Sequence, residues 1–437
     1  MKKPTFRETL RFWTKLGFIS FGGPAGQIAI MHEYLVEKKK WISESRFLHA
    51  LNYCMILPGP EAQQLATYIG WLLYGIRGGL AAGILFVLPS MFILLALSIT
   101  YVSFGNIPWI YAMFNGLKPA VVAIVILALI KIGKRSLISP FHYFVALAAF
   151  IGIYFLGLPF PLIIFGTIIL ALCSRAVFPK LFKKNQPAAA STDAGENDYF
   201  INKHTVIKNA GFNAARFFKQ LATAVALWII PLLVFYFFTA DFSFWSNLSV
   251  FFTKAALVTF GGAYAVLPYV AQVSVQKFGW LTNLQMIDGL GLGETTPGPL
   301  IMVLAFVGFM AGYNHFGSSI AMGTAGLLTT TFYTFLPCFF FIFAGAPIIE
   351  RTQQNKNIKD ILSVVTAAVV GVVLNLTVYF GKAVIFTGAF SLDGINYVML
   401  GWMIISFFAM YRFKIGMIAW IGISAIFGLV YYLLFAA

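Results

Sequence analysis

The sequence predicts an all-α polytopic membrane protein made of two homologous halves. Sixty per cent of its 437 residues are hydrophobic, only 10% are charged, and the mean hydropathy is +0.86. Apolar runs such as 80–102 and 320–344 are long enough to cross a bilayer as helices. A soluble chain of this size could not bury so much apolar surface. The two halves follow from an internal repeat.

The repeat is visible as residues that match at a constant shift. Adding 239 carries residues 21–23 (Phe-Gly-Gly) onto 260–262 and residues 58–60 (Pro-Gly-Pro) onto 297–299. The register holds without a gap from residue 12 to residue 60, and beyond that point the copies match at a shift of 248. Chance does not preserve register over such a length, so we expect two copies of one structural unit.

Two elements in the first copy are interrupted by glycine and proline. Residues 5–36 are expected to form two half-helices around a turn at 20–24, and residues 46–75 two more around 58–60. Proline removes a backbone donor and glycine allows positive φ, so a helix cannot continue through either turn. Each arm is about half a bilayer long. We expect re-entrant hairpins, followed by full-length helices at 78–104, 108–131, 141–157 and 160–178.

Charge placement predicts the topology and accounts for the formal net charge of +16 without nucleic acid. With re-entrant hairpins, the lysines and arginines of the first copy fall on the cytoplasmic side, as does the N-terminus. A polar linker and one extra apolar span then invert the second copy, which gives an inverted-topology repeat. Lys254, Lys277 and Lys382 are exceptions to the charge bias. The expected organisation is a repeat at 1–180, a cytoplasmic linker at 181–220, and an inverter helix plus the second repeat at 221–437.

The broken helices predict an anion site near the middle of the membrane. Each second half-helix begins with unpaired amides and a positive dipole end that face the break. The alternative is that the Gly-Pro turns only let helices pack closely. Lys15 and Lys254 match under the 239 shift and could attract an anion. They could equally extend their ammonium groups to the membrane surface.

Two carboxyl groups lie beside the Pro-Gly-Pro turns at positions that do not match. Glu61 follows the first turn and Glu294 precedes the second. Carboxyls inside a membrane are costly and indicate function by default. A protonated carboxyl would couple proton and anion movement, whereas Glu61 could also be a first-turn residue stabilised by its helix dipole. Neutral hydrogen-bonding groups that could replace hydration are nearby: Gln63, Gln64, Thr295 and Thr296.

Enzyme chemistry finds little support in the sequence. The three cysteines stand singly in apolar surroundings, and the five histidines have no metal-ligand spacing. We therefore expect no catalytic residues, metal or cofactor. A membrane-embedded redox enzyme would need paired cysteines, haem ligands or a flavin motif, and it is kept as the rival class. No Walker-type phosphate loop is present, so we expect a secondary transporter.

The motifs at residues 20–24, 57–70 and 293–299 resemble the chromate ion transporter family in its long, two-domain form. The resemblance implies a multi-pass bacterial inner-membrane protein that exports chromate, as an antiporter or by a related coupling to protons, and confers chromate resistance. Sulfate is the expected competitor, and a sulfate or molybdate transporter is the close alternative. The oligomeric state stays open, with a homodimer among the options. The substrate-binding residues expected from the motifs and the repeat are Gly22, Gly23, Pro24, Pro58, Gly59, Pro60, Glu61, Gln63, Gln64, Gly261, Gly262, Glu294, Thr295, Thr296, Pro297, Gly298 and Pro299.

Overall fold

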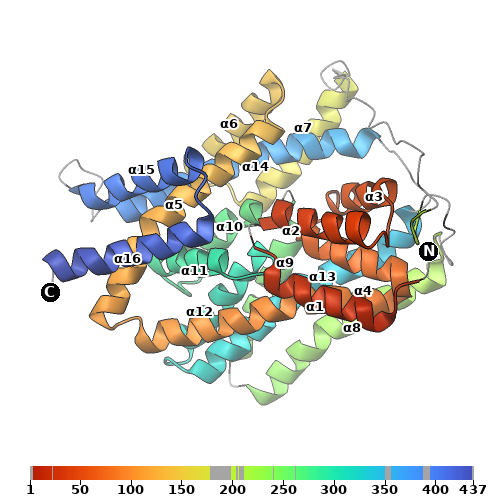
Figure 1. The fold of residues 1–437 in the computed structure, drawn as a ribbon, viewed down its shortest axis with the longest axis horizontal. Helices are drawn as coiled ribbons and strands as arrows, with labels where there is room; N and C mark the ends of the chain where they lie inside the picture. Colours follow the sequence, from red (N-terminus) through yellow and green to blue (C-terminus); the bar gives the residue numbers. More distant parts are fainter. Residues whose placement is uncertain are drawn as a thin grey trace.

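The structure is a computed structural model that describes residues 3–21, 23–177, 198–202, 205, 211–239, 241–260, 262–349, 356–386 and 394–435. The side chains of 175–177, 348–349 and 356–360 are outside this description. Within the described residues the regular elements are helices, with isolated β-bridges at Ile42–Ile201 and Phe386–Ile395. The helices form an elongated bundle (Figure 1). The prediction of an all-α membrane protein is confirmed.

The first half begins with short helices and continues with longer ones. Its elements are α1 (Phe6–Ile19), α2 (Gly23–His32), the π-helical turn η1 (Glu33–Lys38), α3 (Glu44–Cys54), α4 (Glu61–Phe104), α5 (Pro108–Ser136), α6 (Pro140–Tyr154) and α7 (Phe160–Val177). The predicted linker at 181–220 falls mostly outside the described residues, and α8 (Ala214–Phe238) follows it.

The second half repeats this order of short and long helices. Its elements are α9 (Phe242–Leu257), α10 (Ala263–Ala271), the π-helical turn η4 (Gln272–Lys277), α11 (Asn283–Thr295), the 3₁₀ turn η5 (Leu300–Met302), α12 (Val303–His315), α13 (Ile320–Ile349), α14 (Lys356–Ile385), α15 (Tyr397–Tyr411) and α16 (Met417–Phe435). Adding 239 to the bounds of η1 gives those of η4, and α3 and α11 begin at matching residues.

Six of the described helices are long and apolar enough to cross a membrane. Four further apolar helices are shorter, among them α6 and α15. The sequence predicted a helix at 141–157, but α6 ends at Tyr154. The reason is local: Gly157 has a φ of 62°, and Pro159 two residues later cannot continue a helix.

The predicted arm that ends at residue 75 and the predicted span at 78–104 lie end to end in α4. Non-helical backbone at Tyr74 and Gly75 separates them, with a Gly75 φ of 63°. In the second half the corresponding helices, α12 and α13, are separated by a turn in which Gly317 also has a φ of 63°. A left-handed glycine therefore redirects the chain at the same stage of each half.

The helices α4 and α13 form the centre of the bundle and approach each other closely. A Cβ at Gly83 would lie 2.5 Å from a ring carbon of Phe339, and one at Gly79 would lie 2.6 Å from Phe343. Small residues on α4 thus allow aromatic side chains of α13 to pack against its backbone. The first short helix of each half packs against this pair, α1 against α4 and α9 against α13.

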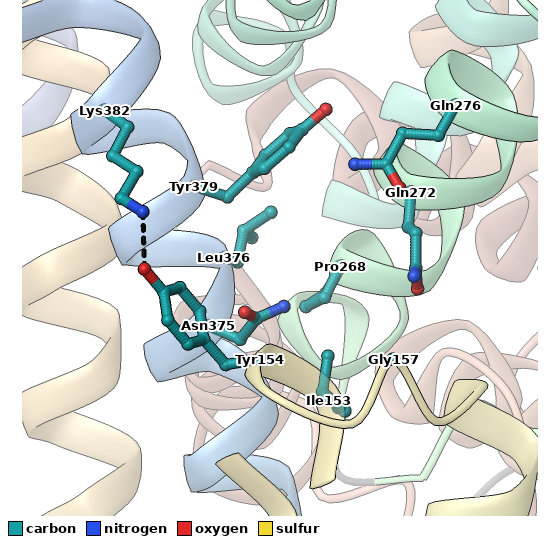
Figure 2. A pocket seen from close by; sticks show the side chains of 10 residues that line it. All are labelled: Ile153, Tyr154, Gly157, Pro268, Gln272, Gln276, Asn375, Leu376, Tyr379 and Lys382. Carbon is teal, nitrogen blue, oxygen red and sulfur yellow. Dashed lines mark hydrogen bonds between the residues drawn. The ribbon is translucent and has the colours of Figure 1, made fainter. Parts of the chain in front are cut away.

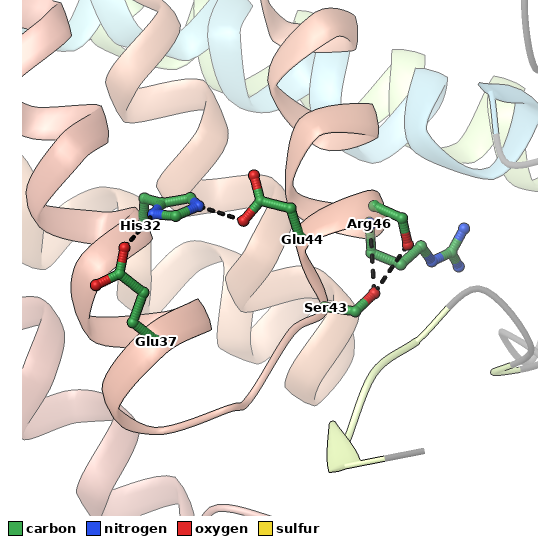
Figure 3. A network of polar contacts seen from close by, with 6 residues as sticks. His32, Glu37, Ser43, Glu44 and Arg46 are labelled. Atoms are coloured by element: carbon green, nitrogen blue, oxygen red, sulfur yellow. Dashed lines mark hydrogen bonds and ion pairs between the residues drawn. The ribbon is translucent and has the colours of Figure 1, made fainter. Parts of the chain in front are cut away.

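A polar network joins α2, η1 and α3 (Figure 3). The His32 ring lies between the carboxylates of Glu37, at 3.2 Å, and Glu44. Ser43 caps α3 by accepting a hydrogen bond from the backbone N–H of Arg46. These contacts tie the end of α2 to the start of α3.

Candidate functional site

The glycine-proline breaks of the two halves are hydrogen-bonded to one another. The backbone N–H of Gly59 donates to the carbonyl oxygen of Thr259 over 2.7 Å. The backbone N–H of Gly298 donates to the carbonyl oxygen of Ser20 over 2.8 Å. Ser20 and Thr259 match under the 239 shift, as do Gly59 and Gly298. Each Pro-Gly-Pro turn therefore bonds to the first break of the other half. We call Gly59–Thr259 the first junction and Gly298–Ser20 the second.

Both junctions require glycine for conformation and for space. Gly59 has a φ of +123° and Gly298 a φ of +102°, values that side-chain-bearing residues rarely adopt. A Cβ on Gly59 would lie 2.7 Å from the sulfur of Cys338, and one on Gly298 would lie 2.8 Å from the Cβ of Ser90. Cys338 and Ser90 match under the 248 shift and lie on α13 and α4. The two junctions therefore flank the central helix pair in equivalent ways.

Buried amides surround the first junction. Gln64 donates from Nε2 to the carbonyl oxygen of Pro58 over 2.7 Å, which closes the turn onto the start of α4. Gln63 donates from Nε2 to the hydroxyl of Thr67 over 3.1 Å. All three polar side chains are fully buried, and the Oε1 atoms of Gln63 and Gln64 have no hydrogen-bond partner among the described residues. Such orphaned acceptors are costly without a ligand, water or proton donor.

A buried amide that the sequence analysis missed lies at the second junction. Gln27, in the second turn of α2, donates from Nε2 to the carbonyl oxygen of Gly298 over 2.6 Å. Its Oε1 atom also has no hydrogen-bond partner among the described residues. The sequence signal was a glutamine inside an otherwise apolar half-helix, close behind the Gly-Gly turn. Both junctions thus combine a glycine turn with at least one buried glutamine.

The two carboxyls differ in their surroundings. Glu61 is the first residue of α4 and is half-buried, where the helix dipole favours a negative charge. Arg135 of α5 supplies a positive charge near its carboxylate. Glu294 is buried near the C-terminal end of α11, where the dipole disfavours a negative charge, and it accepts a hydrogen bond from the hydroxyl of Tyr264. The hydroxyls of the neighbouring Thr295 and Thr296 both donate to the carbonyl oxygen of Leu292 and not to the carboxylate of Glu294.

New helices begin directly after each break. The helices α2 and α10 start beside Gly23 and Gly262, whose φ values are 76° and 97°. The helices α4 and η5 start directly after the prolines Pro60 and Pro299. The first amides of a helix have no partner within that helix, so these starts offer N–H donors and positive dipole ends. N–H donors and positive dipole ends of this kind are suited to small anions.

Several predicted residues do not take part in the junctions that the structure describes. Lys15 and Lys254 are exposed on α1 and α9, which agrees with side chains that extend to the surface. Gly22 and Gly261 are outside the described residues. The half-buried Pro24 lies in the first turn of α2.

A buried ion pair beside α11 also escaped the sequence analysis. Lys118 of α5 and Asp288 of α11 are 4% and 6% exposed, and their charged atoms are 3.8 Å apart. Tyr101 donates to Asp288 over 2.9 Å, and Lys118 donates to Asn115 over 2.6 Å. Lys118 and Asp288 are each an isolated charged residue in an apolar stretch of sequence, and this isolation is the signal that could have identified them. Asp288 lies two turns before Glu294 on α11 and links this helix to the first half.

The chain is similar to chromate transport proteins over most of its length. It is 30% identical to the chromate transport protein of Pseudomonas aeruginosa over 82% of this chain and 77% of that protein. It is 27% identical to the one from Cupriavidus metallidurans, with 86% and 83% covered, and 26% identical to a probable chromate transport protein of Synechococcus elongatus, with 86% and 85% covered. No solved structure matches the chain. The family described as chromate transporter matches residues 7–172 and again 246–429, and this chain belongs to that family.

Proposed function

We propose that the protein is a secondary transporter that carries chromate through a site formed at the two junctions. The single observation that carries this proposal is the reciprocal pair of hydrogen bonds Gly59–Thr259 and Gly298–Ser20. It brings helix starts from both halves to the same central helix pair. Helix starts that meet in this way suit the anionic group of a substrate in broken-helix transporters. The transport of chromate by relatives that cover most of the chain supports the choice of anion.

The site is suited to binding an oxyanion weakly enough to release it. The backbone N–H groups of the helix starts, and the second N–H of the Gln27, Gln63 and Gln64 side-chain amides, can donate hydrogen bonds to an oxyanion in place of water, whereas the unpaired Oε1 atoms are acceptors and need a separate proton donor. The junctions contain no buried lysine or arginine among their described residues, so binding relies on dipoles and neutral donors. Glu61 or Glu294 must be protonated or balanced when a dianion is bound, because an ionised carboxylate would repel it. That requirement supports coupling of proton movement to anion movement.

Alternating access is supported by a difference between the halves. The helices α10 and α11 pack against α14, and α11 also packs against α5. Their counterparts α2 and α3 make at most marginal contact with α5 and α14 in the described part of the chain. Two halves of matching sequence thus adopt two different packings. Exchange of these packings would open the junctions first to one side of the membrane and then to the other, as an inverted-topology repeat allows.

The charge pattern supports an orientation in which the first-half lysines lie in the cytoplasm of a bacterial cell. Export across the inner membrane, with chromate resistance as the result, is proposed from the resemblance to the family and not from the charges. Single cysteines introduced at Lys39 and Lys277 test the inverted repeat. An impermeant thiol reagent should label them from opposite sides of the membrane, and labelling from the same side would exclude the inversion.

The function is tested in everted vesicles that contain the inserted protein. We expect energy-dependent accumulation of radiolabelled chromate, with inhibition by excess sulfate if one site accepts both tetrahedral anions. Vesicles with the Gly59→Ala and Gly298→Ala variants are the controls, because each substitution places a Cβ where a junction has no room. If the protein causes no chromate accumulation but does cause uptake of sulfate or molybdate, the substrate is sulfate or molybdate and not chromate.

A further inference from the structure

A cavity of about 320 Å³ lies outside the two junctions, between α10, η4 and α14. The turn that follows α6 closes one end of it, and side chains from three segments point into the same space (Figure 2). The polar residues of its lining are Tyr154, Gln272, Gln276, Asn375, Tyr379 and Lys382. The other lining residues that the structure describes are apolar or glycine, and none of the described lining residues is a carboxylate.

Lys382 is held at the cavity wall. Its ammonium group donates a hydrogen bond to the hydroxyl oxygen of Tyr154 and lies 4.8 Å from the centre of that ring. Because the Tyr154 oxygen accepts this bond, its own O–H is available to donate to a ligand. The hydroxyl of Tyr379 donates to Asn283 at the start of α11. The cavity is therefore connected by contact to the helix that carries Glu294.

The two lining glutamines match carboxylates in the first half. Gln272 and Gln276 match Glu33 and Glu37 under the 239 shift. Glu33 pairs with Lys38 over 2.6 Å, and Glu37 pairs with His32. Where the first half has two carboxylates, the second half has two amides that can donate hydrogen bonds to an anion. Lys382 matches Lys134 under the 248 shift, so the two halves share this lysine and differ in having carboxylates or amides at the two positions of the π-helical turn.

The cavity adjoins the first junction through α10. From Gly262 to Pro268, which lines the cavity, the helix rises about 9 Å. This short distance along one helix places the cavity next to the first junction.

We propose that this cavity is a vestibule that binds a tetrahedral oxyanion of charge −2 on its way to or from the junctions. The proposal rests on the proposed transport function and adds a second binding site for the same class of anion. Lys382 supplies the charge, and the Tyr154 hydroxyl with the three amides replaces part of the hydration shell. The volume is sufficient for the anion together with several waters.

Thiol protection tests the vestibule independently of transport. Asn375→Cys is introduced after Cys173, which is exposed, has been replaced by Ser, while Cys54 and Cys338 stay buried. Sulfate serves as the probe because it does not oxidise thiols. Sulfate should slow modification of the new thiol in purified protein severalfold more than chloride of equal ionic strength. Gln276→Cys, at an exposed lining position, provides a second reporter if Asn375→Cys does not fold.

Matched lysine variants show whether the charge matters. Lys382→Met should raise the sulfate concentration for half-protection about tenfold, the effect of roughly one favourable charge interaction near a surface. Lys277→Met removes the same charge from η4 but outside the lining, and it should leave protection unchanged. Equal protection by chloride and sulfate, or equal behaviour of the two lysine variants, would overturn the vestibule. Sulfate protection without chromate accumulation in wild-type vesicles would instead overturn the transport function alone.

Discussion

Replacement of Gly59 by alanine should damage the first junction far more than an ordinary glycine substitution. At a φ of +123° alanine is strained by about 1–3 kcal/mol. The new Cβ would also lie 2.7 Å from the Cys338 sulfur and 2.8 Å from Gln64 Nε2. Displacing Gln64 breaks its 2.7 Å hydrogen bond to Pro58 in a buried site, at about 1–3 kcal/mol. The expected loss of stability is therefore about 2–6 kcal/mol.

Two matched variants separate conformational strain from the lack of space. Gly279→Ala adds a Cβ at a φ of +62° with nothing within 4 Å, so it incurs only the strain. Gly59→Ala combined with Cys338→Ala removes one of the two close contacts and should recover part of the loss. The measurement is the thermal midpoint of aggregation of detergent-solubilised protein, together with chromate accumulation in vesicles.

The expected order of thermal midpoints tests the geometry of the junction. Gly59→Ala should have the lowest midpoint, the double variant should be intermediate, and Gly279→Ala should be close to wild type. Equal thermal midpoints for Gly59→Ala and Gly279→Ala would refute the close packing of this turn against α13. If the double variant has the same thermal midpoint as Gly59→Ala, the close contact with Gln64, and not the one with Cys338, causes the loss of stability.

Further substitutions test the carboxyls and the buried ion pair. Glu61→Gln should leave the protein inserted but reduce chromate flux and its dependence on the proton gradient; unchanged flux and dependence would remove its assigned role. Lys118→Met leaves Asp288 charged and unpaired and should cost about 3–5 kcal/mol, whereas adding Asp288→Leu should restore stability in the melting assay. If the double variant melts no higher than the single one, the pair is not coupled. The backbone of Phe244 and the ring of His315 hold the pKa of the Asp241 carboxyl below its usual range. Its stabilisation is thus complete above about pH 4 and lost as pH falls through the lowered pKa, so melting curves of wild type and Asp241→Asn should converge in acid and separate near neutral pH.

The positions of the helix breaks were predictable because they depend on local chemistry. Pro58-Gly59-Pro60 and its counterpart at 297–299 interrupt helices in any tertiary setting, and the structure has α3, α4, α11 and η5 ending or starting there. The ends of some long helices were less predictable. The end of α6 at Tyr154 depended on the left-handed conformation of Gly157, which an apolar pattern does not reveal.

The candidate site was predictable only in part. The motif residues Gly59, Gln63 and Gln64 were identified, and all three are buried at the first junction. Gln27 was missed because its partner, Gly298, is 271 positions away along the chain. Lys118 and Asp288 were missed for the same reason, since neither charge has a partner nearby in sequence. Lys15 and Lys254 were predicted as possible anion-attracting residues because they match under the 239 shift, yet both are exposed.

The sequence by itself determined that this protein is helical, belongs in a membrane and contains two stretches that match at a constant shift. Those properties follow from hydropathy, from the backbone limits of glycine and proline, and from residue matching at a constant shift. Only the tertiary structure decided that each Pro-Gly-Pro turn bonds to the other half, and that α10 and α11 pack on α14 while α2 and α3 make at most marginal contact with α5 in the part of the chain that is described. Contacts between segments far apart along the chain depend on how whole helices pack, and local sequence does not specify that packing.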